Sequence, residues 1–235
     1  MHDLSAPKVL SGLSDTRFRH IEVHATLGST QTLLVAEGGK DGRVVVADHQ
    51  SAGRGRAGRS WLDVPGAMLM FSALLRDVPI ERAPLVSLAA GLAVARAIGD
   101  DARLKWPNDV RIGGRKVCGV LGEAAADFVV IGVGVNVGHA EGDLPAELEA
   151  TSLRIARGEA PPRDELLVAI LRELDAIVGS DFLDEYRTRC ETIGSRVRVE
   201  LADGSYEGVA EAVADDGSLI VDGKPVVAGD VVHVR

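Results

Sequence analysis

Glycine and arginine alternate in one short stretch of an otherwise acidic chain. The stretch reads GRGRAGRSW over residues 53–61 and carries Arg54, Arg56 and Arg59. Glycine lets a backbone approach a bound group closely, and the arginine guanidinium is a planar, permanently charged fork that pairs with phosphate and carboxylate oxygens. The combination predicts a loop that closes over an anion. From this pattern alone, a solvated connection or a loop that touches RNA without sequence preference is an open alternative.

The glycine-arginine stretch is not a Walker A phosphate loop. That motif ends in Gly-Lys-Ser/Thr and opens a helix, whereas this stretch ends at Trp61 ahead of an apolar segment that reads as a strand. A phosphate bound here would be held by arginine forks and by backbone amides of the loop.

A second polar segment, KWPND, spans residues 105–109, and Lys116 follows it across the turn signal GGR. A tight hairpin at that turn would bring Lys116 close to Asn108 and Asp109, where its ammonium group could bridge two anions. The alternative is a buried tryptophan followed by a polar turn, with a lysine that points to water.

Two shorter segments complete the set of unusual residues. In GSTQ, residues 28–31, the small hydroxyls can cap a helix or touch a ligand. In GVGVN, residues 132–136, glycines at alternate strand positions leave a bare strip of backbone against which a ligand or another backbone can lie. The histidines form no ligand pattern and no nucleophile is paired with a histidine, so we expect neither a protein metal site nor a covalent nucleophile.

Apolar periodicity places these segments on an α+β fold, with a mixed, mostly antiparallel sheet and helices on one side of it. Strands are expected at about residues 20–27, 43–50, 67–76, 102–112, 116–124 and 128–137, and helices from Ser29 or Thr30 and at 84–98, 163–178 and 181–190. Residues 138–162 read as a polar surface connection. From Gly194 short strands alternate with turn signals, which predicts a small barrel, so we expect domains at 1–192 and 193–235.

The composition and net charge of the chain disfavour several classes of protein. The chain has 235 residues, 46% of them hydrophobic, and a formal net charge of −9. This charge disfavours a surface built to attract nucleic acid. Two distant cysteines indicate no disulfide framework, and neither a signal peptide nor a membrane-spanning stretch is evident. We therefore expect a cytoplasmic protein that binds no membrane.

In their order along the chain, the four segments resemble those of the biotin protein ligases. The pair GRGRAGRSW and KWPND…RKVCG carries the resemblance, which covers nearly the whole chain. It implies a class II synthetase-like, biotin-lipoyl ligase fold with a C-terminal SH3-like barrel. It also implies that biotin is activated with MgATP to biotinyl-5'-AMP and pyrophosphate, then transferred to a lysine of a biotin carboxyl carrier protein or domain. ATP, biotin and Mg²⁺ are then needed, without a permanent prosthetic group.

The resemblance implies a role for each motif residue, Lys116 being the lysine that contacts the biotin carboxylate and a phosphoryl oxygen. The implied catalytic residues are Lys116, Arg54, Arg56, Asp109 and Lys105. The implied biotin-binding residues are Ser29, Thr30, Gln31, Gln50, Arg54, Gly55, Arg56, Lys116 and Gly119. The implied ATP-binding residues are Arg56, Arg59, Trp61, Asn108, Lys116 and Asn136. The family commonly has asparagine in place of Gln31, so we expect that contact to be shifted or replaced.

Two rival functions remain open. A lipoate or octanoate protein ligase or transferase is related in fold and also modifies a carrier lysine. A biotin-responsive transcription regulator would need a DNA-binding domain; few residues precede the first strand and the chain is acidic, so we expect no DNA binding.

Overall fold

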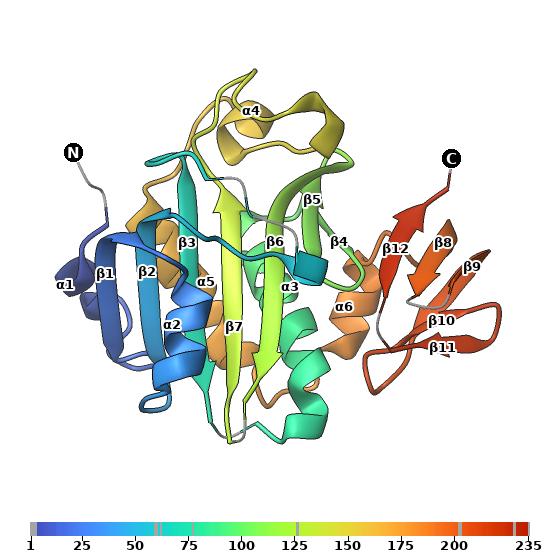
Figure 1. Ribbon diagram of the computed structural model, residues 1–235, viewed down its shortest axis with the longest axis horizontal. Coiled ribbons are helices and arrows are strands. Elements are labelled where there is room, and N and C mark those ends of the chain that lie inside the picture. The colour runs from blue at the N-terminus through green and yellow to red at the C-terminus, as the bar shows by residue number, and fades with distance from the viewer. Residues whose placement is uncertain are drawn as a thin grey trace.

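The computed structural model describes residues 4–58, 61, 63–76, 78–125, 127–201, 204–227 and 229–234. A seven-stranded mixed sheet, flanked by helices, makes up most of the molecule, and five strands near the C-terminus form a second sheet beside it (Figure 1). This is the predicted α+β architecture. Within the described ranges, no helix is long and apolar enough to cross a membrane.

The large sheet has the order β1-β2-β3-β7-β6-β5-β4. Only β1 and β2 run parallel; all other neighbours are antiparallel, as predicted. Its strands are β1 (His20–Leu27), β2 (Arg43–Gln50), β3 (Met68–Leu75), β4 (Ala102–Lys105), β5 (Asp109–Ile112), β6 (Arg115–Ala124) and β7 (Val129–Asn136). The expected strand over 102–112 is split by a turn at 106–108, because Pro107 has no N–H to donate to a ladder.

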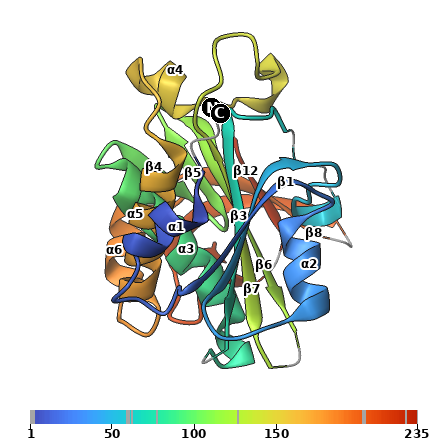
Figure 2. The same ribbon diagram turned by 90° about the vertical axis from the view of Figure 1, so that its left-hand side faces the viewer.

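Helices cover both faces of this sheet, so the expectation of helices on one side was wrong. α1 (Ala6–Ser11), α3 (Ala83–Ile98), α5 (Arg163–Ile177) and α6 (Leu183–Arg189) lie on one face and α2 (Thr30–Glu37) on the other (Figure 2). Successive strand residues point to opposite faces. Val44 and Val46 accordingly join the large core, while Val45 packs with Leu34 of α2 in a smaller one.

The apolar stripe predicted for the helix at residues 163–178 is confirmed in α5. It is buried throughout, at Leu166, Leu167, Ile170, Leu171, Leu174 and Ile177.

The polar connection after β7 contains only a short 3-10 turn, η3 (Ala146–Leu148), and α4 (Leu153–Arg157) among its described residues. Two further 3-10 turns are η1 (Arg56–Gly58) and η2 (Ile80–Arg82).

The C-terminal sheet has the order β11-β10-β9-β8-β12 and is antiparallel throughout. Its strands are β8 (Arg196–Leu201), β9 (Gly204–Val213), β10 (Leu219–Val221), β11 (Lys224–Val226) and β12 (Asp230–His233). The first part of β9 pairs with β8 and its last part with β10, so one long strand joins the two halves of this sheet. Trp106 Nε1 donates to the Gly217 carbonyl at 2.9 Å, which fastens this sheet to the KWPND segment. The domain boundary after residue 192 stays a prediction.

Candidate functional site

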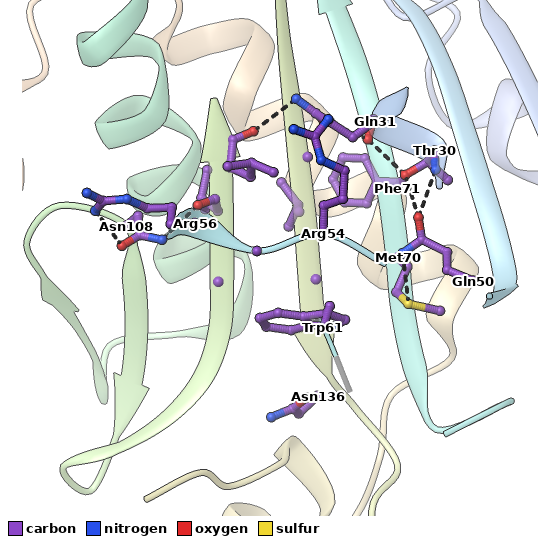
Figure 3. Close-up of a pocket in the computed structure, with 18 of the residues that line it drawn as sticks. Thr30, Gln31, Gln50, Arg54, Arg56, Trp61, Met70, Phe71, Asn108 and Asn136 are labelled. Atoms are coloured by element: carbon purple, nitrogen blue, oxygen red, sulfur yellow. Dashed lines mark hydrogen bonds between the residues drawn. The ribbon is translucent and has the colours of Figure 1, made fainter. Parts of the chain in front are cut away.

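A cavity of about 320 Å³ lies over the central strands β3, β7 and β6, between the start of α2 and the glycine-arginine loop (Figure 3). Every predicted site residue in the described ranges lines it except Lys105. Arg59 lies outside the described residues. The volume suits a small-molecule ligand.

One end of the cavity is polar and begins at the N-terminus of α2. Ser29 has extended backbone and its hydroxyl accepts a hydrogen bond from Thr32 N at 3.3 Å, so Ser29 is the N-cap. The Thr30 hydroxyl lies 2.8 Å from Ser72 Oγ on β3, and Thr30 N donates to Gln50 Oε1 at 2.8 Å. Hydroxyl and amide groups therefore converge from α2, β2 and β3.

Gln31 closes this polar end. Its Nε2 donates to the Val130 carbonyl at 3.1 Å, and its Oε1 accepts from Ser72 Oγ at 3.1 Å. A Cβ atom at Gly132 would lie 2.7 Å from that Oε1, so the missing side chain makes room for the longer glutamine. Gln31 is 3% exposed and its amide is used by the protein itself.

Sequence reasoning missed the floor that β3 contributes. Met70, Phe71 and Ser72 line the cavity from a strand whose side chains are all buried. Ser72, a polar residue in the run MLMFSALL, was the available signal, because a buried hydroxyl needs hydrogen-bond partners.

The glycine-arginine loop lies across the cavity, and both of its described arginines have protein partners. Arg54 Nη1 lies 3.1 Å from Glu123 Oε2 on β6. Arg56 Nη1 donates to Asn108 Oδ1 at 3.1 Å, and its Nη2 donates to the Gly229 carbonyl at 2.8 Å. Arg56 thus joins the loop to the KWPND segment and to the C-terminal sheet.

Trp61 covers the strip of glycines on β6 and β7. Gly119 and Gly134 are register partners, and Cβ atoms there would lie 2.8 Å and 2.7 Å from the indole ring. Only bare backbone permits this contact. Lys116 Nζ lies 5.4 Å from the centre of the ring, within cation-π range. The strip was predicted to receive a ligand or a backbone, and here an aromatic side chain of the same chain lies on it.

Lys116 reaches the cavity from β6, after a hairpin whose Gly113 and Gly114 have φ of 55° and 75°. Its Nζ lies 2.6 Å from Asp109 Oδ1, which confirms the proximity predicted for these two side chains. Asn108 lines the same cavity but contacts Arg56 and, through Nδ2, the Val120 carbonyl at 2.9 Å. The hairpin therefore sets a lysine–aspartate ion pair at the cavity wall.

Lys105 is half-buried on β4, outside the cavity lining. Burial lowers the pKa of its ammonium group, Asp109 opposes the shift, and Arg111 and Lys116 add to it. Its charge therefore interacts with those of Asp109 and Lys116.

A second wall comes from the polar connection after β7, which sequence reasoning had treated as surface. Leu144, Leu148 and Ala150 line the cavity. Backbone bonds hold this wall, from Lys116 N to the Glu149 carbonyl at 2.9 Å and from Thr151 N to the Lys116 carbonyl at 2.8 Å. Asn136 Nδ2 also donates to the Thr151 carbonyl, at 2.9 Å. The available signal was the presence of Leu144 and Leu148 in a largely polar segment.

The cavity combines three cations, Arg54, Arg56 and Lys116, with a polar end and an apolar wall. Such a set can neutralise a charged substrate and hold it in place, which is what transfer between phosphate and carboxylate groups requires. Asp109 is the one carboxylate among the described lining residues. Nowhere in the described ranges do three or more His, Cys, Asp or Glu side chains gather in a way that could hold a metal ion.

Comparison with known proteins gives matches along most of the chain. Residues 25–136 match the biotin/lipoate A/B protein ligase family, and residues 192–234 match the biotin protein ligase C-terminal domain. The chain is 41% identical to the biotin–[acetyl-CoA-carboxylase] ligase of Mycobacterium tuberculosis over 93% of this chain and 90% of that protein. It is 33% identical to the bifunctional ligase/repressor BirA of Bacillus subtilis over 93% of this chain and 74% of that protein. The structure of a biotin protein ligase from Aquifex aeolicus in complex with biotin and ATP is similar, with a TM-score of 0.79 and 28% identity over 93% of this chain and 100% of that one.

Proposed function

The chain belongs to the biotin protein ligase family, and we propose that it activates biotin with MgATP and transfers it to a lysine of a biotin carboxyl carrier protein or domain. The observation that carries the proposal is the cavity itself, in which a polar end, a lysine–aspartate pair and two loop arginines surround one small-molecule volume. Each reaction step needs charge neutralisation and positioning more than a nucleophilic side chain.

In the first step the biotin carboxylate attacks the α-phosphorus of ATP, and pyrophosphate leaves. The polar end formed by Ser29, Thr30, Gln31 and Gln50 would hold the ureido ring, with Gly119 at the wall. Lys116 would face the carboxylate and the α-phosphoryl oxygens, where negative charge accumulates in the transition state. Gly55, between Arg54 and Arg56, lets the loop backbone approach this anion.

In the second step the acceptor amine attacks the biotinyl carbonyl, the amine loses a proton and AMP leaves. Lys116 would stabilise the charge returned to the phosphate, while Asp109 and Lys105 would orient the phosphate or the incoming lysine. The ion pair between Lys116 and Asp109 supports this assignment, because it places a cation and a carboxylate at one wall of the cavity.

The nucleotide would occupy the end of the cavity near Trp61 and Asn136. An aromatic ring, a buried amide and the apolar side chains of Leu144 and Leu148 all belong to the lining of the cavity. A purine base is flat and apolar on its faces and polar at its edge, which matches these groups. Arg56 and Asn108 would then lie on the phosphate side, and Arg59 is assigned to the nucleotide by its place in the motif.

Magnesium would enter as MgATP. Mg²⁺ is usually held by substrate phosphates, waters and only one or two carboxylates, and the described lining offers one, Asp109. When bound, the ion neutralises phosphate charge and activates the pyrophosphate leaving group.

For the two domains we propose a division of labour, in which residues 1–192 carry the chemistry and residues 193–235 help to position the loop. The bond from Arg56 to the Gly229 carbonyl supports this role. We further propose that the chain works in the cytoplasm and binds no DNA, because Cys118 and Cys190 are unpaired thiols and the net charge is −9.

The rival substrate is lipoate or octanoate, and exchange of labelled pyrophosphate into ATP separates the two. We expect exchange with biotin and none with lipoate or without an acid. Lys116→Ala should lower the rate on the order of 10²–10³-fold, as loss of a group that stabilises transition-state charge does. Lys40→Ala, at an exposed lysine, is the control. Exchange with lipoate alone would move the chain to the rival activity, and none with either acid would refute both.

A further inference from the structure

A buried carboxylate lies beside the cavity without lining it. Asp63 follows the glycine-arginine loop, and its side chain is 6% exposed. Its Oδ2 accepts a hydrogen bond from Gln50 N at 2.5 Å and lies 2.8 Å from His49 Nδ1. An ionised carboxylate only accepts, so His49 Nδ1 carries the proton of this bond. Asp63 thus ties the exit of the loop to its entrance.

The hydrogen bonding at the end of β2 explains why the N–H of Gln50 needs an acceptor from Asp63. β2 pairs with β1 as far as Gln50, but with β3 only as far as Ala47, opposite Met70. Ser51 N donates to the Leu27 carbonyl on β1, so the preceding N–H, that of Gln50, points to the other side. No ladder partner from β3 reaches it, and Asp63 supplies the missing acceptor.

Gln50 connects its backbone hydrogen bond with Asp63 to the side chains of the cavity. Its Oε1 accepts from Thr30 N at 2.8 Å and from the Thr30 hydroxyl at 3.2 Å, and its Nε2 lies 3.3 Å from Met70 Sδ (Figure 3). Thr30 in turn contacts Ser72. Asp63 is therefore connected to the polar end of the cavity through one intervening residue, Gln50. Along the chain it lies two positions after Trp61, which covers the glycine strip.

We infer that Asp63 is a positioning residue that couples closure of the glycine-arginine loop to the polar, biotin-binding end of the cavity. The assignment of that end to biotin rests on the proposed function; the mechanical coupling does not. A carboxylate holds two donors more strongly than a neutral side chain does, because both bonds are charge-assisted. His49 and Gln50 stay aligned only while the loop exit remains in place, so an open loop also loosens the groups that contact Thr30.

The test compares Asp63→Asn with Asp222→Asn. Asp222 is an exposed residue whose carboxylate also accepts a backbone N–H, from Val209 at 2.9 Å, in the C-terminal sheet. In Asp63→Asn we expect the KM for biotin in pyrophosphate exchange to rise about tenfold, the difference between a charge-assisted and a neutral hydrogen bond, with kcat changed less than about twofold. His49→Ala, at a more exposed position, should shift the same KM in the same direction by less.

A second readout needs no activity. Trypsin cleaves after Arg54 and Arg56, and we expect faster cleavage there in ligand-free Asp63→Asn than in Asp222→Asn, with circular dichroism checking the fold of each. An unchanged KM for biotin with unchanged cleavage would overturn the inference. So would an equal rise in the KM values for biotin and ATP with a lowered melting temperature, which indicates a structural role alone. If the wild-type protein shows no biotin-dependent exchange, the proposed function fails, and cleavage of the ligand-free variants still decides whether Asp63 holds the loop.

Discussion

Replacing Gly134 with alanine tests whether Trp61 must lie on the glycine strip for the nucleotide to bind. The added Cβ would lie 2.7 Å from Cε2 and Cζ2 of the indole. Carbon atoms in contact are separated by roughly 3.5 Å or more, so the ring has to lift by about 0.8 Å. Trp61 belongs to a loop and Gly134 to a central strand, so we expect the loop to move and the sheet to stay.

The expected effect follows from the cost of overpacking. A methyl group forced into a close-packed contact costs about 1–3 kcal/mol, and here that energy is taken from the closed state of the loop. At 1.4 kcal/mol per factor of ten, the ratio of closed to open loop falls about 5- to 150-fold. The KM for ATP should rise by a factor in that range, while the melting temperature stays close to that of the wild type.

Pyrophosphate exchange at varied ATP concentration measures the effect, and a double-mutant cycle locates it. In a Trp61→Ala background the clash is gone, so Gly134→Ala should add little. Gly91→Ala is the control, because its Cβ would lie 3.6 Å from the Leu104 side chain, an ordinary contact. An unchanged or lower KM for ATP in Gly134→Ala, or an equal loss in both backgrounds, would refute the reasoning.

Three further predictions concern stability and the loop arginine. Burial lowers the pKa of fully buried His139, so below its ordinary value of 6.5 the unfolded chain binds a proton that the folded chain does not. The free energy of unfolding should therefore decrease as the pH is lowered below 6.5. Urea titrations at pH 5 and 7.5 should show a smaller decrease for His139→Leu than for the wild type, and equal decreases in the two proteins would contradict this. Arg163→Met should lower the free energy of unfolding by about 3–5 kcal/mol, because Asp48 then loses a buried partner at 2.5 Å, and Asp48→Leu should restore much of it; a loss below 1 kcal/mol in urea would argue against the pair. Arg56→Lys keeps the charge but loses the fork that joins two acceptors, so the KM for ATP in exchange assays should rise about tenfold, and an unchanged value would count against this contact.

Much of the site was predictable because its residues are adjacent in sequence and chemically unusual. Glycine beside arginine in the loop, and Lys116 one short hairpin away from Asp109, are local patterns that the backbone geometry preserves. Ser72 and Leu148 were missed, because each differs from the dominant polarity of its segment, and only the packing of distant elements brings them to the cavity.

The sequence by itself determined the family motifs, most of the strands and helices along the chain, and the buried stripe of α5, since these depend on residue types and on periods of two or 3.6 residues. It predicted neither α1 nor the division of residues 102–112 into β4 and β5. Only the tertiary structure decided that α2 covers the opposite face of the sheet, that Trp61 lies on Gly134, and that Arg56 bonds to the Gly229 carbonyl, 173 residues away. These contacts depend on strand register and on how the two sheets dock. Register and docking are decided by the sum of many long-range contacts, which no local pattern contains.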